Sequence, residues 1–457
     1  MTADRILSVI QIPKKENMMS VYEKLLEMID GLQIVDTHEH LPMEADRPKD
    51  TDVLAEWLTH YFSCDLVSAG LSPQELEKAR DSSQSLQRRW KLVEPYWQAA
   101  RSTGYGRSLD LAAKGIYGLD GVNGRTIAPL DEAFRAARKK GGHYQCVLKD
   151  KSRIALSIVD PLVDSELGCD RKFFVFAARL DEFIFPTHRR DIARIGRELD
   201  ISIHSLDDWK QAMHCRLEQA LKKGAVTLKS GLAYLRSLHF EKAGYGQAEQ
   251  QFRQLFSEEH SPEMREGIKM GKAFQDYMMH HLLALADERG MPFQFHTGIQ
   301  EGNGNVIADA NPVHLSNLFL EYENVKFDIF HMGYPYCMEL SNLAKNFRNV
   351  FIDMCWGHVI SPEAARRALV EWLDAVPANK ISAFGGDYCF VDGVYGHQEL
   401  ARQNVAASLA QKVADGSFDI DRAKEIARWV FVDNPRRLFG LDKLIRAAKK
   451  SKVGKKR

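Results

Sequence analysis

The chain has 457 residues, of which 45% are hydrophobic and 27% charged, and its 62 basic and 62 acidic side chains cancel. This length allows one large α/β domain with insertions, or two to three domains of average size. A formal net charge of zero gives no support for binding to nucleic acid or to an anionic membrane surface. No run of eighteen apolar residues occurs, so we expect no membrane span.

The cysteines and the two ends of the chain suggest a cytoplasmic protein. Seven cysteines are scattered without a CxxC pair, which predicts neither a zinc ribbon nor a disulfide framework. Such a pattern fits a reducing compartment. Lys14, Lys15 and Glu16 interrupt the N-terminal segment, so no signal peptide is expected there. Residues 446–457 contain seven Lys and Arg residues, which we interpret as a solvated basic tail.

Short apolar runs of strand length recur along the chain and alternate with amphipathic segments in its second half. Repeated strand-then-helix units predict a parallel sheet, and eight of them predict a closed (β/α)8 barrel of the TIM type. We therefore expect one α/β barrel domain over residues 1–457. The eight predicted strands are 32–38, 152–160, 172–181, 225–230, 292–298, 326–333, 350–357 and 381–388.

Helix signals mark the segments between these strands. Gly290 ends a long amphipathic segment as a C-cap, while Ser361 and Pro362 suit the N-cap and first position of another helix. Residues 44–151 are too long for a simple loop after the first strand and contain several helical patterns. We predict that they form a helical insertion on the catalytic side of the barrel, with a smaller excursion at 240–264.

The first predicted strand ends in "QIVDTHEHLP", which contains His38 and His40 one residue apart. Side chains two apart in a strand point the same way, so both imidazoles would point into the barrel mouth. Barrel enzymes place their active sites at that end. An HxH pair alone is weak evidence for a metal, because paired histidines also occur in loops and in hydrogen-bonded protein interiors.

Other predicted strands also end in one ionisable residue. His296 ends "FQFH", His331 ends "FDIFH" and Asp387 ends "SAFGGD". A core histidine explains one such position but not all of them in the same register. Imidazoles and a carboxylate are ligands that suit Zn²⁺ or a similar metal, so the set predicts a metal site.

These motifs resemble the amidohydrolase superfamily of metal-dependent barrels, and in particular its "amidohydrolase 2" branch. The similarity is carried by HxH at 38–40 and by "FHTG", "HMGYPYCMELSNLAKNFRNVFIDMCW", "KISAFGGDY" and "DNPRRLFGL". It covers mainly residues 229–441 and the first-strand motif. The long insertion at 44–151 is similar in length and helical character to that of uronate isomerases in the same superfamily.

The resemblance implies roles for the strand-end residues. It assigns His38, His40, His296 and Asp387 to metal binding, and it places His331 near the metal as a second-site ligand or as a group that polarises the substrate. Asp387 and His331 are then the catalytic residues. A metal lowers the pKa of its water to about 7, and a carboxylate beside that water can take its proton.

Lys229 ends the fourth predicted strand, where binuclear members of the superfamily carry a carbamylated lysine that bridges two metals. The following "KSGLAYLRSL" instead resembles mononuclear members, in which a lysine would contact an anionic substrate. A lysine without a functional role is the third interpretation. We expect one divalent ion, Zn²⁺, and two if Lys229 is carbamylated.

The predicted substrate-binding residues are Lys229, Arg236 and Tyr334. Arginine suits a substrate carboxylate because its guanidinium donates two parallel hydrogen bonds. The other histidines, among them His60, lack the strand-end register, and we expect them to be structural or solvent-facing. Asp36 is expected to orient an imidazole, and Glu39 to point away from the metal.

The sequence thus predicts a metal-dependent hydrolase that cleaves a C–N or C–O bond of a small, anionic molecule. One alternative keeps the site but changes the reaction to decarboxylation, hydration or uronate-type isomerisation. Another is a barrel without catalytic activity that serves as an interaction module. We expect a small-molecule substrate and neither a nucleic-acid nor a membrane partner; a homo-oligomer is compatible with the sequence.

Overall fold

A computed structural model describes residues 15–48, 50–161, 170–186, 189–254 and 271–445 of the chain. Eight strands form one sheet in the order β1 to β8, and every neighbouring pair is parallel. This confirms the predicted (β/α)8 barrel. The strands are β1 (Ile34–Glu39), β2 (Ile154–Val159), β3 (Phe174–Arg179), β4 (Ala225–Ser230), β5 (Phe293–Phe295), β6 (Phe327–Ile329), β7 (Val350–Asp353) and β8 (Ile381–Ser382).

Backbone hydrogen bonds between β1 and the segment after β8 close the barrel. The amide of Thr37 donates to the carbonyl of Phe384 at 3.0 Å, and that of Asp387 donates to the carbonyl of His38 at 2.8 Å. Further on, the amide of His40 donates to the carbonyl of Tyr388 at 3.2 Å. Closure thus fixes the position of Asp387 relative to both histidines.

Helices after the later strands complete the barrel. The predicted caps are present, because Gly290 ends α13 in the left-handed conformation and the Ser361 side chain accepts a hydrogen bond from the amide of Ala364 at the start of α17. These helices are α13 (Lys272–Arg289), α14 (Ser316–Glu321), α15 (Cys337–Asn346), α16 (Gly357–Ile360), α17 (Pro362–Ala375), α18 (Val391–Ala414), α19 (Ile420–Arg428) and α20 (Asn434–Leu438).

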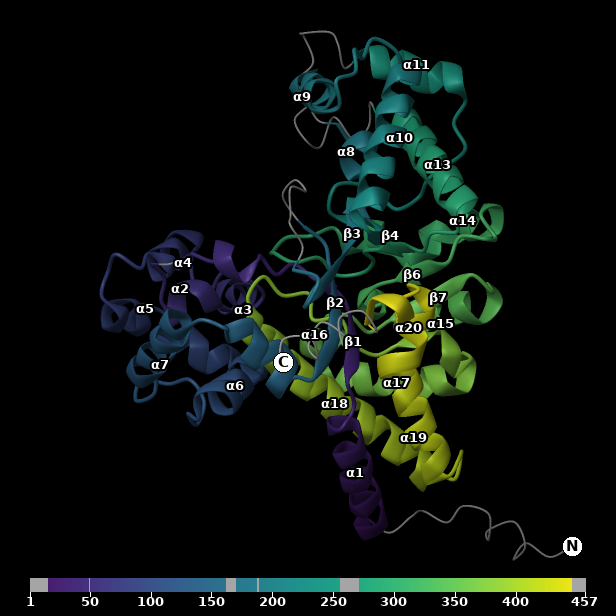
Figure 1. The fold of residues 1–457 in the computed structure, drawn as a ribbon. Helices are drawn as coiled ribbons and strands as arrows, with labels where there is room; N and C mark the ends of the chain where they lie inside the picture. The colour runs from purple at the N-terminus through teal and green to yellow at the C-terminus, as the bar shows by residue number, and fades with distance from the viewer. Residues whose placement is uncertain (1–14, 49, 162–169, 187–188, 255–270, 446–457) are drawn as a thin grey trace, which may run out of the picture.

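The segment between β1 and β2 forms a helical lobe to one side of the barrel, seen at the left of Figure 1. It consists of α2 (Val53–Trp57), α3 (Phe62–Ser68), α4 (Pro73–Arg80), α5 (Leu86–Ala100), α6 (Gly104–Tyr117) and α7 (Ile127–Lys140). Asp392 at the start of α18 ties this lobe to the barrel. Its carboxylate accepts from Trp57 Nε1 at 3.1 Å and from the Tyr117 hydroxyl at 2.8 Å.

A second group of helices extends from the barrel at the top of Figure 1. Its labelled members include α8 (Asp181–Ile184), α9 (Arg189–Leu199), α10 (Leu206–Lys223) and α11 (Tyr245–Gln254). At the opposite end of the view, the N-terminal helix α1 (Lys15–Asp30) packs on α18. The predicted excursion at 240–264 lies partly, and the basic tail at 446–457 wholly, outside the described residues. Among the described helices, none has the length and apolarity needed to cross a bilayer.

Candidate metal centre and active site

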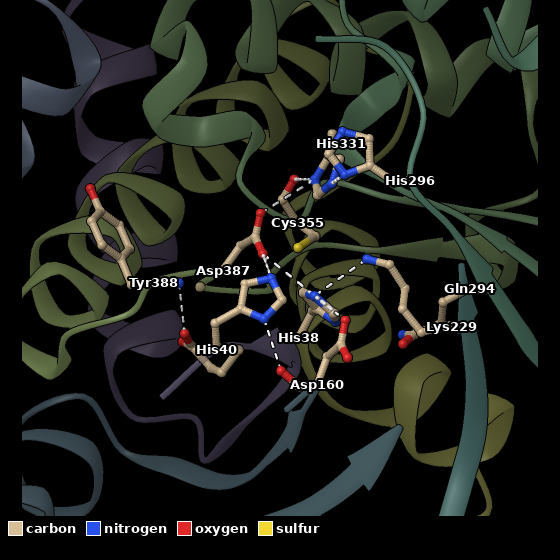
Figure 2. A network of polar contacts seen from close by, with 12 residues as sticks. His38, His40, Asp160, Lys229, Gln294, His296, His331, Cys355, Asp387 and Tyr388 are labelled. Carbon is tan, nitrogen blue, oxygen red and sulfur yellow. Dashed lines mark hydrogen bonds and ion pairs between the residues drawn. The ribbon is translucent and has the colours of Figure 1, made fainter. Parts of the chain in front are cut away.

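His38 and His40 lie at the carboxyl end of β1, next to Asp387 from the segment after β8 (Figure 2). Nε2 of His38 lies 3.5 Å, and Nε2 of His40 3.2 Å, from Oδ1 of Asp387. All three side chains are buried or nearly so, and that of His40 is 12% exposed. The sheet closure therefore brings together three of the four predicted metal ligands.

The backbone fixes which ring nitrogen of His40 carries hydrogen. Nδ1 lies 2.9 Å from the carbonyl oxygen of Asp160, which can only accept, so we assign the hydrogen to Nδ1. In the neutral ring Nε2 then has a lone pair, which faces a carboxylate oxygen of Asp387. Two acceptors this close require a positive centre, which is either a second proton or a metal ion.

His331 and His296 face each other in the same way. Nδ1 of His331 donates to the carbonyl of Cys355 at 3.1 Å, and Nε2 of His296 donates to the carbonyl of Ile299 at 3.0 Å. The two remaining nitrogens lie 2.9 Å apart. Burial lowers the pKa of His331 to about 4 and that of His296 well below its ordinary value, so both rings favour the neutral form. Nε2 of His331 and Nδ1 of His296 therefore each carry a lone pair, and the two lone pairs point at each other.

His38 is also held in its neutral form. Burial, followed by the nearby Lys229 ammonium, lowers the pKa of His38 well below its usual value. Its Nδ1 is buried without a hydrogen-bond partner among the described residues. A neutral imidazole is the form that binds metals.

The Asp387 carboxylate stays ionised although it is buried. Burial raises its pKa, but the hydrogen bond to His40 and the nearby His331 and His38 more than offset this and hold the pKa well below its usual range. The two oxygens face different partners. Oδ1 faces the first-strand histidines, whereas Oδ2 accepts from the Tyr61 hydroxyl at 2.6 Å.

The donor atoms of this cluster fit a divalent metal. Ligand atoms lie within 4.8 Å of one another inside each of two separate sets, namely His38, His40 and Asp160, and His331, Cys355 and Asp387. In each of His40, His296 and His331, one ring nitrogen donates a hydrogen bond to a backbone carbonyl and the other faces the cluster. Metal-binding histidines are usually oriented in this way. His296 reaches the cluster through His331, so its direct role as a ligand stays a prediction.

Lys229 lies in the cluster at the end of β4. Its Nζ is 3.3 Å from Nε2 of His38 and 4.3 Å from the ring centre of Phe330. The side chain is buried, and burial lowers the pKa of its amine. The structure thus places this predicted residue beside the metal ligands.

The structure does not bring Arg236 to the cluster. Its guanidinium is buried and pairs with Asp276 of α13 at 2.6 Å, and it also bonds Gln275 and the carbonyls of Ser237 and His239. These contacts occupy four of its five N–H donors, so they favour a structural role for Arg236 over the predicted contact with substrate. Tyr334 directly follows the short turn His331–Gly333 and is half-buried, and its carbonyl accepts from the amide of Ile299 at 2.7 Å.

The side chains of Asp36 and Glu39 on β1 accept hydrogen bonds from different backbone amides. Asp36 was expected to orient an imidazole, but its Oδ1 accepts from the backbone amides of His38 at 3.3 Å and Gly386 at 3.0 Å. Glu39 accepts from the amide of Tyr388 at 2.9 Å and does not belong to either set of candidate metal-binding donors among the described residues. Burial raises the pKa of Asp36 to about 6, and burial together with Asp36 raises that of Glu39.

Two residues that the sequence interpretation missed end strands next to the cluster. Asp160 follows β2, and its Oδ2 pairs with the Arg179 guanidinium and lies 3.8 Å from His38 Nε2. Arg179 is the last residue of β3 and is 28% exposed. The signal was available, because "SIVD" and "FVFAAR" are apolar runs that end in an ionisable residue.

Two further residues come from the helical lobe. Tyr61 donates to Asp387 and stacks on Trp356 with ring centres 4.5 Å apart. His60, expected to be structural or solvent-facing, is buried against Tyr61, and burial lowers its pKa to about 3. No strand-end signal marks either residue, because both precede helix α3.

The fold and the site define a (β/α)8 barrel whose mouth carries an amidohydrolase-type array of histidines and an aspartate. Residues 240–441 match the family described as amidohydrolase. The predicted resemblance to that family is therefore confirmed over this part of the chain.

Similarity to individual proteins extends further along the chain. The chain is 21% identical to a uronate isomerase from Cutibacterium acnes, over 96% of this chain and 98% of that protein. The structure of glucuronate isomerase from Caulobacter crescentus superposes with a TM-score of 0.77 at 18% identity, covering 97% of both chains. Protein fluG from Emericella nidulans is 27% identical over 37% of this chain, which spans only 20% of fluG.

Proposed function

We propose that the protein is a metal-dependent enzyme that isomerises a uronate, a sugar that carries a carboxylate. The reaction moves hydrogen between two adjacent carbons and so interconverts an aldehyde sugar and a keto sugar. The similarity to uronate isomerases supports this proposal because it runs over nearly the whole length of both chains. The amidohydrolase match, by contrast, begins at residue 240 and does not include the helical lobe.

The contact between Tyr61 and Asp387 carries the proposal. Tyr61 belongs to the lobe between β1 and β2, and its hydroxyl lies 2.6 Å from Oδ2 of the strand-end carboxylate. Burial, then Asp387, raises the pKa of Tyr61, so the hydroxyl keeps its proton and acts as a donor. The lobe thus contributes a polar group to the site. This favours a function like that of the uronate isomerases, because the similarity to them includes the lobe.

In this proposal the two carboxylate oxygens of Asp387 have different roles. His38, His40 and Oδ1 of Asp387, with Asp160 beside them, would hold the metal. A bound divalent ion supplies a Lewis acid that polarises the substrate carbonyl. Oδ2 is the oxygen that would take the proton from the carbon next to that carbonyl and deliver it to the carbonyl carbon, while the proton of the adjacent hydroxyl passes to the carbonyl oxygen. Tyr61 donates a hydrogen bond to the same oxygen and orients it.

Arg179 is proposed to bind the substrate carboxylate in place of Arg236. Its guanidinium is close to the metal ligands through Asp160 and is partly exposed. Burial lowers the pKa of Arg179, but Asp160 and Asp181 outweigh this and keep the group charged. An arginine whose charge is only partly neutralised can still donate hydrogen bonds to a second carboxylate.

The metal is proposed to be a single Zn²⁺ ion. Neutral imidazoles and a carboxylate are typical zinc ligands. The Lys229 amine lies 3.3 Å from His38 Nε2. In this proposal it is a cation beside the metal ligands and would contact an anionic oxygen of the substrate.

The test is to incubate the zinc-loaded protein with D-glucuronate and related uronates in D₂O and to follow the sugars by NMR. Isomerisation predicts a keto product, and proton exchange at the carbon next to the carbonyl predicts deuterium in the sugar. The Asp387→Asn variant is the control and should produce neither signal. A fully zinc-loaded protein that converts none of a panel of uronates would contradict the proposal.

Hydrolysis of a C–N or C–O bond is the second candidate, and the amidohydrolase match over β5 to β8 favours it. The same Asp387 oxygen would then take its proton from water. A product that carries ¹⁸O from solvent water, formed from an amide, lactone or ester of a small acid, would support hydrolysis over isomerisation.

A further inference from the structure

The backbone of Asp387 adopts an unusual conformation. Its φ is +57°, in the left-handed region that residues other than glycine rarely occupy. A residue in this region needs surrounding contacts that hold it there. The carboxylate of Asp387 can reach both the histidines and Tyr61 only while this backbone conformation persists.

Two carboxyl groups of β1 hold the peptide groups on either side of Asp387. Asp36 Oδ1 accepts from the amide of Gly386 at 3.0 Å, and Glu39 Oε2 accepts from the amide of Tyr388 at 2.9 Å. Both side chains are fully buried. The amide of Asp387 itself donates to the carbonyl of His38 at 2.8 Å. Three consecutive amides therefore bond to one strand.

The segment lies directly on the Glu39 carboxyl. A Cβ atom added to Gly386 would be only 1.8 Å from Glu39 Oε1, so a side chain at this position would displace the Glu39 carboxyl. Glu39 does not belong to either set of candidate metal-binding donors among the described residues. Its contacts are with the backbone that carries Asp387, and not with the proposed metal position.

We propose that Asp36 and Glu39 are positioning residues that hold Asp387 in its left-handed conformation and so aim its carboxylate at His38 and His40. The first-strand motif then has two functions. His38 and His40 present the imidazoles of the proposed metal site, and Asp36 and Glu39 fix the last predicted ligand of the barrel. This inference rests on the metal site of the proposed function but not on the identity of the substrate.

The experiment measures Zn²⁺ and Co²⁺ binding to the full chain, together with the visible absorption of the Co²⁺ form, which reports the ligand geometry. Glu39→Ala removes the acceptor for Tyr388 and should weaken metal binding by about 10- to 100-fold, as loss of such orienting partners does. It should also change the Co²⁺ spectrum. Glu39→Gln retains an oxygen that can accept from Tyr388 and should restore both affinity and spectrum.

Two further variants keep the outcome clear if Glu39→Ala does not fold. Glu39→Asp keeps a carboxylate but shortens the side chain, so it should behave like the alanine variant. Asp276→Ala removes a buried, ion-paired carboxylate far from the cluster and should lower stability without changing metal affinity. Wild-type affinity and spectrum in folded Glu39→Ala or Glu39→Asp would overturn the inference alone. A wild-type chain that binds no metal would overturn the proposed metal site as well.

Discussion

Nε2 of His40 lies 3.2 Å from Oδ1 of Asp387, and neither atom carries hydrogen when the imidazole is neutral and the carboxylate ionised. The hydrogen of His40 is on Nδ1, which donates to the carbonyl of Asp160 at 2.9 Å. Two lone pairs at this distance repel unless a cation lies between them. That cation is either a second proton or a metal ion, so this relationship supports the proposed metal site at the mouth of the barrel.

We therefore expect His40→Ala and Asp387→Asn to lose the metal. Each substitution removes one of two facing donors, and the remaining ligands should hold the ion at least about 10-fold less tightly. Elemental analysis after dialysis measures this directly. His314→Ala is the control, because the His314 ring is only partly buried and its side chain bonds the carbonyl of Ala308 outside the cluster. Full metal occupancy in Asp387→Asn would show that this carboxylate is not a ligand.

Tyr61→Phe should leave metal content unchanged but lower the isomerisation rate. The hydroxyl contacts Oδ2 of Asp387, the oxygen that we propose moves the proton, so its loss should lower kcat by about 10²-fold or more. Tyr117→Phe is a matched control on the same lobe, because its hydroxyl donates to the Asp392 carboxylate at 2.8 Å outside the cluster. Equal rates for the two variants would remove Tyr61 from the mechanism.

The strand pattern was sufficient to predict the barrel and the strand ends at which the proposed metal site lies. Each of the eight predicted apolar runs overlaps one observed strand, because the alternation of buried residues and polar ends is a local property of the sequence. The registers of β1 and the segment after β8 then bring His38, His40 and Asp387 together. The same rule, applied to β2 and β3, would have found Asp160 and Arg179.

Contacts between distant segments could not be predicted in this way. Tyr61 and His60 lie before a lobe helix, and their place at the barrel mouth depends on how the whole lobe packs. Arg236 resembled a substrate-binding residue because it follows Lys229 closely. Its partner, Asp276, is 40 residues further along the chain on α13, and no local pattern indicates that pairing.

Replacing Arg179 should affect binding of the substrate carboxylate more than catalysis. Arg179→Met removes one charge-assisted contact, so KM for a uronate should rise by about 10- to 100-fold while kcat changes less. Arg194→Met, which loses a nearby arginine paired with Glu182, is the control. An aldose analogue that lacks the carboxylate distinguishes the explanations. If Arg179→Met slows both sugars equally, Arg179 does not recognise the carboxylate.

Lys229→Met should retain about one metal ion per chain. In a binuclear site with a carbamylated lysine, two ions would lie about 3.5–4 Å apart, and loss of the lysine would release metal. Here the Lys229 amine contacts Nε2 of His38 at 3.3 Å. Elemental analysis of wild type and variant, each purified with and without added bicarbonate, measures the difference. Two ions in wild type and fewer than one in the variant would favour the binuclear site.

Acid should destabilise the protein through His358, a buried histidine away from the metal ligands. Its Nε2 donates to the carbonyl of Ala383 at 2.9 Å, and its Nδ1 accepts from the Asn404 side chain at 3.3 Å, so protonation breaks the second bond. Burial lowers the pKa of His358 to about 4. Between that pKa and the unfolded value of about 6.5, the unfolded chain binds the extra proton, so the free energy of unfolding falls as pH falls.

The expected loss from this one residue is on the order of 3 kcal/mol once the pH is below about 4. Urea unfolding of wild type and His358→Gln at several pH values from 7 to 5 tests it. The variant should be less stable at pH 7, because it loses at least one of the two hydrogen bonds, but its stability should fall less steeply with acid. Parallel pH dependences would mean that His358 does not contribute to acid sensitivity.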